Sequence, residues 1–154
     1  MAVGDIVWFD QALLDLGIKR HDLSTEDIRV GFITSAVTPL MNTSDPRWGA
    51  GGGTNLSSSQ VATGGTSYTG PLALTTKSWS IVSGVPTFRA DVLNIAQDAS
   101  GFTNARWGIL FNNTDAGKRA LAFIDLGSDR SLVAGSLTLD WQGAGNDILT
   151  LDQV

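Results

Sequence analysis

The first apolar positions of the chain follow a helical spacing. Four of them recur at intervals of three or four residues: Ile6, Phe9, Leu13 and Leu16. That spacing gathers side chains on one face of an α-helix. Asp5 precedes the run as an N-cap candidate, and Gly17 follows it as a stop signal. The pattern predicts one short amphipathic helix over residues 6–16.

Most of the remaining apolar residues alternate with polar ones, which is typical of β-strands. Ile28, Val30 and Phe32 mark a compact strand over residues 28–34. Later runs are separated by turn clusters rich in Gly, Asn, Asp and Ser, and they predict strands over residues 72–82, 87–96, 105–112, 120–126, 132–141 and 148–151. Short strands with such turns predict a mostly-β domain, an antiparallel β-sandwich or jelly-roll-like fold with one short N-terminal helix.

The segment between residues 38 and 59 is rich in Pro, Asn, Ser and Gly and includes a run of glycines at 51–53. Its composition predicts a long surface loop that is either functional or ordered by a neighbour. The length of 154 residues indicates one domain, 1–154. Within it, residues 1–59 carry the helix, a strand and the loop, and residues 60–154 carry the sandwich body.

The charge distribution narrows the classes of partner. The formal net charge is −5 with ten basic residues, and these are scattered along the chain. Binding to a phosphate backbone requires clustered Lys and Arg, so neither nucleic acid nor an anionic membrane is expected as a partner. No run approaches the ~20 apolar residues of a membrane span. The start of the chain has no signal-peptide pattern, and synthesis in a host cytoplasm is expected.

Candidate chemistry is sparse. The chain has no cysteine, which excludes thiolate catalysis and Cys-based metal sites, and we expect no cofactor and no metal. His21 is the only histidine. It stands beside Lys19 and Arg20 without a nucleophile motif, and it is expected to be a solvated loop residue rather than a general base.

Three acids in or beside predicted strands could form the carboxylate pair of a glycoside hydrolase: Asp91, Asp125 and Asp140. A carboxylate at the end of a strand more often caps a turn. The structural role is therefore favoured, and the chain is not expected to be an enzyme.

Five tryptophans are many for this length. Trp79, Trp107 and Trp141 fall in predicted strands and are expected in the core or on a sheet face, and Trp8 is expected to pack the helix onto the sheet. Trp48 stands in the Gly-rich segment, where two alternatives stay open. It is either an interface anchor, because buried aromatics dominate binding hot spots, or a lid over its own domain.

Several segments together resemble a widespread family of small tailed-phage proteins, usually encoded among head and tail morphogenesis genes. The similar segments are residues 12–17, 27–39, 65–70, 88–92, 105–111, 122–127 and 137–141. The resemblance covers most of the chain in order. It implies a structural component of the virion, and it supplies no catalytic residues.

The function expected from this resemblance is that of a capsid decoration (cement) protein on the outer surface of the head. Its partners would be the major capsid protein and further copies of itself, as a homotrimer. Arg47, Trp48, Trp8 and Tyr68 are the candidate protein-interface residues. Two alternatives remain: a tail, collar or head-fibre subunit that binds host surface glycans by aromatic stacking, and a hydrolase using Asp91 and Asp125.

Overall fold

The computed structural model describes residues 4–49, 51–141 and 145–151. Their secondary structure elements are, in chain order, β1 (Ile6–Trp8), α1 (Asp10–Gly17), β2 (Ile28–Ile33), β3 (Pro46–Arg47), β4 (Thr54–Asn55), the 3₁₀ helix η1 (Leu56–Ser59), β5 (Leu72–Ala73), β6 (Ser78–Val82), β7 (Val85–Arg89), β8 (Leu93–Ile95), β9 (Ala105–Asn112), β10 (Ala120–Arg130), β11 (Leu137–Leu139) and β12 (Asp147–Thr150).

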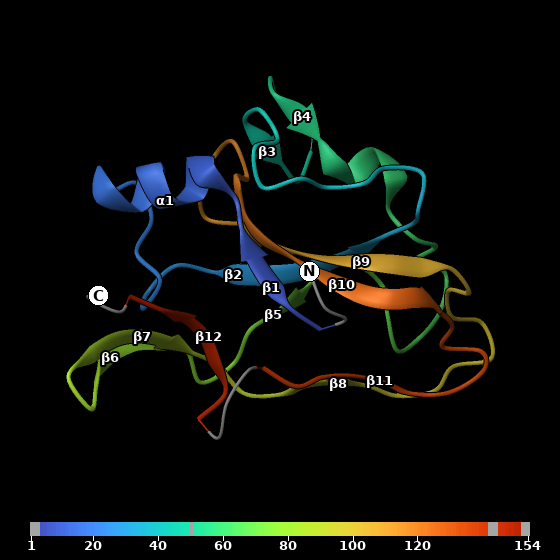
Figure 1. Ribbon diagram of the computed structural model, residues 1–154. Helices are drawn as coiled ribbons and strands as arrows, with labels where there is room; N and C mark the ends of the chain where they lie inside the picture. The colour runs from blue at the N-terminus through green and yellow to red at the C-terminus, as the bar shows by residue number, and fades with distance from the viewer. Residues whose placement is uncertain (1–3, 50, 142–144, 152–154) are drawn as a thin grey trace.

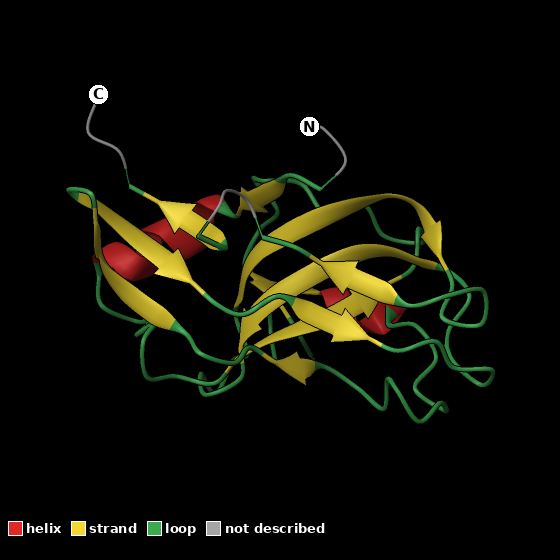
Figure 2. Ribbon diagram, turned by 90° about the horizontal axis from the view of Figure 1, so that it is seen from below, coloured by secondary structure: helices red, strands yellow, loops and turns green. Residues whose placement is uncertain are grey.

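The largest sheet lies in the middle of the molecule. Its strand order is β1-β10-β9-β2-β5, and every neighbouring pair is antiparallel. One face is covered by α1, β3, β4 and η1, and two smaller sheets, β11-β8 and β12-β7-β6, lie on the other side (Figure 1). Seen from below, the strands of the smaller sheets lie in front of the helices (Figure 2). The prediction of a mostly-β, antiparallel, sandwich-like fold is confirmed.

Both faces of the central sheet are buried, which explains why β2 and β9 are apolar almost throughout. Successive side chains of a strand point to opposite faces. We call the face covered by α1 the upper side and the face covered by the two smaller sheets the lower side, as in Figure 1. Phe32 packs on the lower side, against Tyr68 and Phe102. Gly31 opens to the upper side, where Trp48 covers it.

The upper side of the sheet is closed by aromatic contacts. The Trp48 indole stacks on Phe111 with ring centroids 5.1 Å apart and an interplanar angle of 7°. Phe9, just before α1, packs against Phe123 at 5.1 Å. These two contacts seat the Gly-rich segment and α1 side by side on one sheet face.

The lower side depends on a tyrosine that completes the backbone pairing of β2. The Phe32 N–H donates to the Tyr68 hydroxyl at 3.2 Å, and the Phe32 carbonyl accepts from the Val61 N–H at 3.1 Å. Asp98 fixes the loop before Tyr68, because its carboxylate accepts the N–H groups of Thr66 and Ser67. These and other backbone donors lower the pKa of Asp98 to about 2.

The predicted helix over residues 6–16 is wrong in its first part. Ile6–Trp8 forms β1, which pairs with β10, and α1 begins only at Asp10. The helix buries Ala12 and Asp15, whereas Leu13, one of the residues used for the prediction, is exposed. The spacing of Ile6 and Phe9 arose from an edge strand followed directly by a helix, and a period cannot separate two such short elements.

The segment 38–59 is not the exposed loop that its composition predicts. It contains β3, β4 and η1, and it buries Pro46, Trp48 and Leu56. Backbone hydrogen bonds tie it to the rest of the domain, including one from the Trp48 N–H to the Lys118 carbonyl at 2.8 Å. The segment is thus ordered by its own domain.

Predicted strands match the structure best where a strand is long and central. The prediction for residues 105–112 coincides with β9. The prediction for 72–82 splits into β5 and β6, because Thr76 has a positive φ of 50° and donates its hydroxyl to Asp91 at 2.5 Å. The prediction for 87–96 also splits, and that for 132–141 shrinks to β11.

Gly31 is predicted to be indispensable to this packing. A Cβ at this position would lie 2.3 Å from the Trp48 indole, so that the ring would have to move. We expect Gly31→Ala to lower the free energy of unfolding by about 1–3 kcal/mol, the usual cost of overpacking. Urea denaturation followed by tryptophan fluorescence measures the change.

Gly17→Ala is the matched control, because a Cβ there meets no atom within 4 Å. It should leave stability unchanged or raise it by up to about 1 kcal/mol. Trp48→Ala alone should destabilise by about 3–5 kcal/mol, and Gly31→Ala should add little to it. Additive losses in the double variant would contradict the predicted contact.

Candidate functional site

The four residues predicted as a protein interface do not form an exposed surface. Tyr68 is fully buried, with 0% of its surface exposed, and Trp48 is 6% exposed. Trp8 is also buried and donates its indole N–H to the Ile148 carbonyl at 3.2 Å. These three aromatic side chains are core residues of their own domain, and of the two alternatives for Trp48 the structure shows the lid.

Arg47 is likewise engaged within the chain. Its guanidinium donates two hydrogen bonds to the Asp45 carboxylate, at 2.8 and 3.0 Å. This partner raises the pKa of Arg47 above its ordinary value. Only 13% of the side chain is exposed. A surface partner therefore has little access to this cation.

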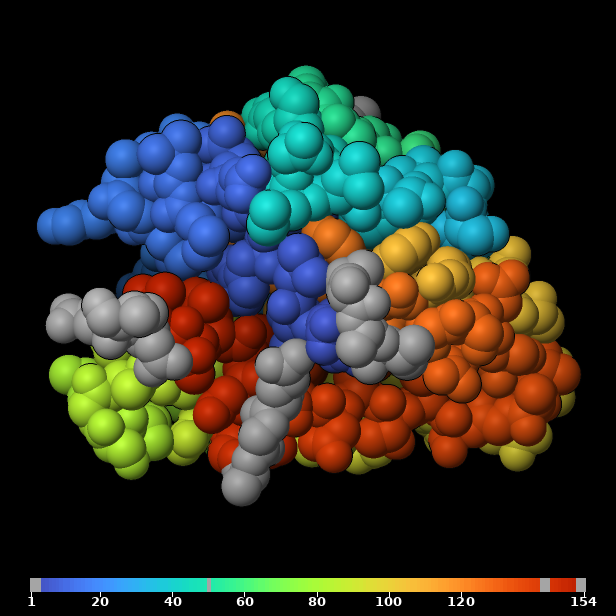
Figure 3. Space-filling view, viewed as in Figure 1, coloured from blue at the N-terminus to red at the C-terminus, as the bar shows by residue number. Residues whose placement is uncertain are grey.

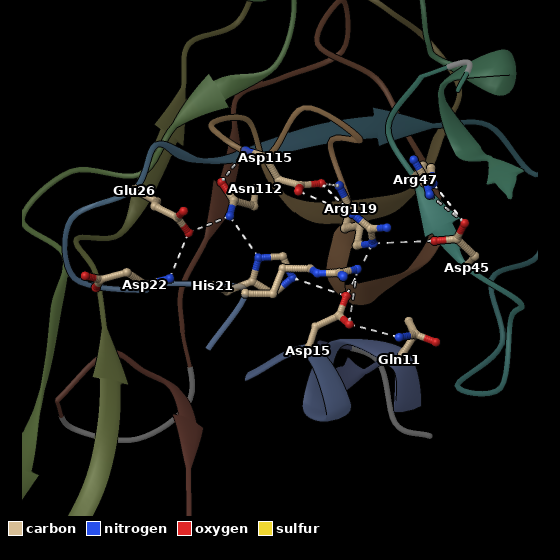
Figure 4. Close-up of polar contacts among 11 residues, drawn as sticks. Gln11, Asp15, His21, Asp22, Glu26, Asp45, Arg47, Asn112, Asp115 and Arg119 are labelled. Carbon is tan, nitrogen blue, oxygen red and sulfur yellow. Dashed lines mark hydrogen bonds and ion pairs between the residues drawn. The ribbon is translucent and has the colours of Figure 1, made fainter. Parts of the chain in front are cut away.

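His21 is buried, and the expectation of a solvated loop residue is wrong. Its ring lies in a polar cluster between α1 and the end of β9 (Figure 4). The Asn112 amide donates to His21 Nδ1 at 2.9 Å and to the Glu26 carboxylate at 2.6 Å. Because an amide nitrogen only donates, His21 Nδ1 accepts, and the neutral ring carries its proton on Nε2. That atom faces Asp15 Oδ2 at 3.7 Å.

Arg119 is the cation that links this cluster to the Gly-rich segment (Figure 4). Its guanidinium lies 3.4 Å from Asp15, 3.2 Å from Asp115 and 3.7 Å from Asp45. These three carboxylates come from α1, from the turn before β10 and from the residue before β3. A buried carboxylate such as Asp15 requires a paired cation. The cluster is therefore a clamp between α1, the central sheet and the segment above it.

The geometry does not favour catalysis at His21. Asp15 Oδ2 and His21 Nε2 have no hydrogen-bond partner, and the two side chains are 1% and 0% exposed. Burial lowers the pKa of His21, and the neighbouring carboxylates only oppose that effect in part. A general base must reach its substrate, and in this arrangement the ring is closed off.

Of the three acids considered for a carboxylate pair, the structure separates Asp91 from the other two. Asp125 and Asp140 line a cavity of about 660 Å³ between the start of β1, β10 and the segment around β11, whereas Asp91 binds the hydroxyls of Thr75 and Thr76 elsewhere. The Arg106 guanidinium holds the pKa of Asp125 below its ordinary value. A glycosidase acid needs a raised pKa, and the environment of Asp125 acts in the opposite direction.

Apart from Val133, the large apolar side chains that are exposed among the described residues lie on two surfaces. The helix surface combines the outer side of α1 with a neighbouring loop: Leu13, Leu14, Ile18, Leu40 and Met41. The Asp10 N–H donates to the Met41 carbonyl at 3.0 Å, which holds this loop against the start of α1. Figure 3 shows the two segments adjoining each other at the upper left of the molecule.

The hairpin surface lies on the sheet β12-β7-β6. Trp79 and Ile81 on β6 are 37% and 73% exposed, and Leu151 after β12 is also exposed. The hairpin projects at the same end of the molecule as α1 (Figures 1 and 3). The alternation of Ser and apolar residues in β6 indicated a sheet face, but it gave no sign that this strand lies at an edge.

The chain was compared with protein-family models, with curated proteins and with solved structures, and no match was found in any of the three comparisons. The resemblance to tailed-phage virion proteins therefore stays a prediction. Among the described residues, no helix is both long enough and apolar enough to cross a membrane.

The burial of His21 predicts that stability falls in mild acid. The folded pKa lies below the ordinary value of 6.5, so the unfolded chain binds more protons than the folded one as the pH falls through that value. Stability must then decrease with decreasing pH. We expect the midpoint of thermal unfolding to fall between pH 7.5 and 5.5, as measured by circular dichroism.

His21→Gln is the control for this titration. It removes the only histidine, the side chain whose ordinary pKa falls in this pH range. The variant should be less sensitive to pH across that window than the wild type. An equal pH dependence in both proteins would show that His21 is not the group responsible.

The clamp makes a second prediction. Arg119→Gln removes the nearer of the two arginines beside the buried Asp15, since Arg119 lies at 3.4 Å and Arg20 at 3.7 Å, and it should cost about 3 kcal/mol of unfolding free energy. Arg29→Gln is the control, because more than a third of its side chain and about a third of that of its partner Asp27 are exposed, and it should cost less than about 1 kcal/mol. Equal losses in chemical denaturation would contradict a special role for Arg119.

Proposed function

We propose that the chain is a structural protein of a tailed-phage virion that acts by binding other proteins, and that it decorates the outer surface of the capsid. The observation that carries this proposal is the placement of the two apolar surfaces. Exposed leucine, isoleucine, methionine and tryptophan side chains lie on α1 with the loop at 40–41 and on the sheet β12-β7-β6. Apolar patches of this kind mark sites of protein association.

The distribution of reactive groups supports the same function. His21 is enclosed, Asp125 is paired with Arg106, and Asp91 joins two threonine hydroxyls across a turn. Each of these residues has a role in holding the fold. A domain whose charged groups are mostly paired internally, and which exposes a set of large apolar side chains, suits a protein that bridges neighbouring subunits.

A decoration protein of this type acts by mass action. A protein that binds the assembled shell more tightly than the free subunits stabilises the shell by the free energy of that differential binding. We assign the shell contact to the helix surface, because α1 and the loop at 40–41 present their apolar side chains together. The partners are then the major capsid protein and further copies of the chain, at the capsid exterior.

Two further expectations accompany this assignment. A homotrimer at local three-fold positions would match the symmetry of a capsid lattice. The net charge of −5 gives no electrostatic attraction to nucleic acid or to an anionic membrane. Both expectations are testable by determining the mass of the purified protein and its binding to DNA-coated and lipid-coated surfaces.

We favour decoration over the glycan-binding alternative. Sugar binding by stacking needs exposed aromatic rings. Tyr68, Trp8 and Trp48 are buried, as are Trp107 and Trp141, and Trp79 is the one Trp or Tyr among the described residues that is more than a tenth exposed. A single ring offers a small platform for a sugar chain.

The shell contact is tested by adding purified protein to expanded heads that lack it and measuring occupancy. Leu14→Glu and Ile18→Glu together place two charges in the middle of the helix surface, where each apolar side chain contributes about 1.5–3 kcal/mol when buried. We expect occupancy at a fixed protein concentration to correspond to at least a tenfold weaker affinity. The midpoint of unfolding should be unchanged, because both positions are exposed.

Thr63→Glu is the control, since it adds a charge at an exposed loop position outside both surfaces. It should bind as the wild type does. Wild-type occupancy by the double variant would remove the helix surface from the contact, and failure of the wild type to bind heads would overturn decoration itself.

A further inference from the structure

The free edge of β6 points to a second copy of this chain as its partner. We propose that two copies associate by antiparallel pairing of β6 with β6 about a two-fold axis at Ser80, which joins two three-stranded sheets into one. The inference goes beyond the proposed function and does not rest on it. It depends on three observations: the direction of the unpaired backbone groups, the pattern of side chains, and the absence of charge on the strand.

The first observation concerns the backbone. Within the described residues, β6 pairs with β7 alone, and β7 continues to β12. The Pro86 carbonyl accepts from the Leu151 N–H at 3.0 Å, so residue 86 directs its backbone polar group toward β12. Its partner Ile81 is therefore in a non-hydrogen-bonded pair with Pro86, and Ile81 directs its own N–H and C=O outward. Trp79, two residues earlier, does the same.

These outward groups are complementary to themselves. In an antiparallel pair centred on Ser80, Trp79 lies opposite the partner's Ile81, and Ile81 lies opposite the partner's Trp79. All the outward N–H and C=O groups of both strands then become donors and acceptors across the axis. This register also matches every residue of Ser78–Val82 with a strand residue of the second copy, whereas a shift by two residues brings the turn at Ser83 or Thr76 into the pairing.

The second observation is that the side chains fit the same register. Trp79 and Ile81 project from the same face of β6 as Phe88 and Pro86, their partners on β7. Across the axis, each Trp79 would pack beside a β-branched Ile81, one of the favourable cross-strand combinations. The pairing covers the most exposed large apolar side chain of the described residues, Ile81 at 73%.

The third observation is that β6 has none of the usual protection of an edge strand. Edge strands are commonly kept apart by charged side chains, by proline or by being very short. The strand Ser78–Val82 contains no charge and no proline. By contrast, the edge strands of the central sheet, β1 and β5, have three and two residues, and β12 begins with Asp147, which is paired with Arg89.

The interface is small, since stable complexes bury about 1,200 Å² or more. We therefore expect the pairing to be weak in dilute solution and to strengthen where many copies are held close together, as on a surface that binds them. The test of this pairing must therefore detect a transient dimer and show which residues of the two β6 strands lie opposite each other.

Disulfide trapping meets both needs, because the chain has no cysteine of its own. In a non-hydrogen-bonded antiparallel pair the two Cα atoms lie about 4.5 Å apart, within the range that a disulfide spans. Ser80→Cys would place two thiols at this separation across the axis. Ser78→Cys is the matched control on the same strand, because its two copies would lie about 14 Å apart at 3.4 Å per residue.

We expect Ser80→Cys to form covalent dimers under mild oxidation at least tenfold faster than Ser78→Cys at equal concentration. Adding Ile81→Lys to Ser80→Cys should bring the rate down to that of the control, because it places a charge against the apolar face of the partner strand. Ile81 is exposed, and circular dichroism should show that this variant folds. Equal crosslinking rates for Ser80→Cys and Ser78→Cys, or a rate unaffected by Ile81→Lys, would overturn the proposal.

Discussion

The contact of Trp48 with Gly31 and Phe111 is the interaction on which the upper half of the structure depends. A segment as rich in glycine as residues 49–53 supplies few apolar side chains of its own, and ordering it has a large entropic cost. One indole laid flat on the central sheet offsets much of that cost, because it buries a large apolar area. The contact is possible only where the sheet has no side chain, and Gly31 provides that space. The indole of Trp48 therefore requires a glycine at position 31, which is distant from it in sequence.

The polar cluster between α1 and the end of β9 lies beside this contact. Forming it has a larger desolvation cost, because it buries charged groups. Asp15 and His21 are enclosed, and the charge of Asp15 is offset by Arg119 and Arg20. Arg119 also approaches Asp45, which is hydrogen-bonded to Arg47 within the segment 38–59. Such a network adds little stability beyond what apolar packing would give, but it fixes one arrangement of the pieces it joins. The orientation of α1, and with it the direction of the exposed leucines, depends on these ion pairs.

Sequence periodicity predicted the parts of the fold that are governed by local pattern. The strand over residues 105–112 and the compact strand near residue 28 were predicted well, because buried central strands are continuous apolar runs with clear ends. The burial of Trp48 and Tyr68 was not predicted, because their neighbours in sequence are mostly polar, whereas their neighbours in space include Phe111 and Phe32. His21 was misplaced for the same reason, since Asn112 lies ninety-one residues away. The exposed positions Ile81 and Leu14 depend on which strand is an edge and which helix face is outside, and neither is encoded in a short window.

The charged groups of the domain mostly pair with one another, and its exposed apolar side chains lie mainly on the helix surface and the hairpin surface. That division is expected of a protein whose work is to be bound in place, and capsid decoration is the function that fits it best among those considered. The most direct measurement is cryo-electron microscopy of the parent virion at a resolution that identifies this domain. The proposal predicts density on the outer surface of the head lattice, with α1 turned toward the shell. Density confined to the tail or collar, or no such density in the virion, would contradict it.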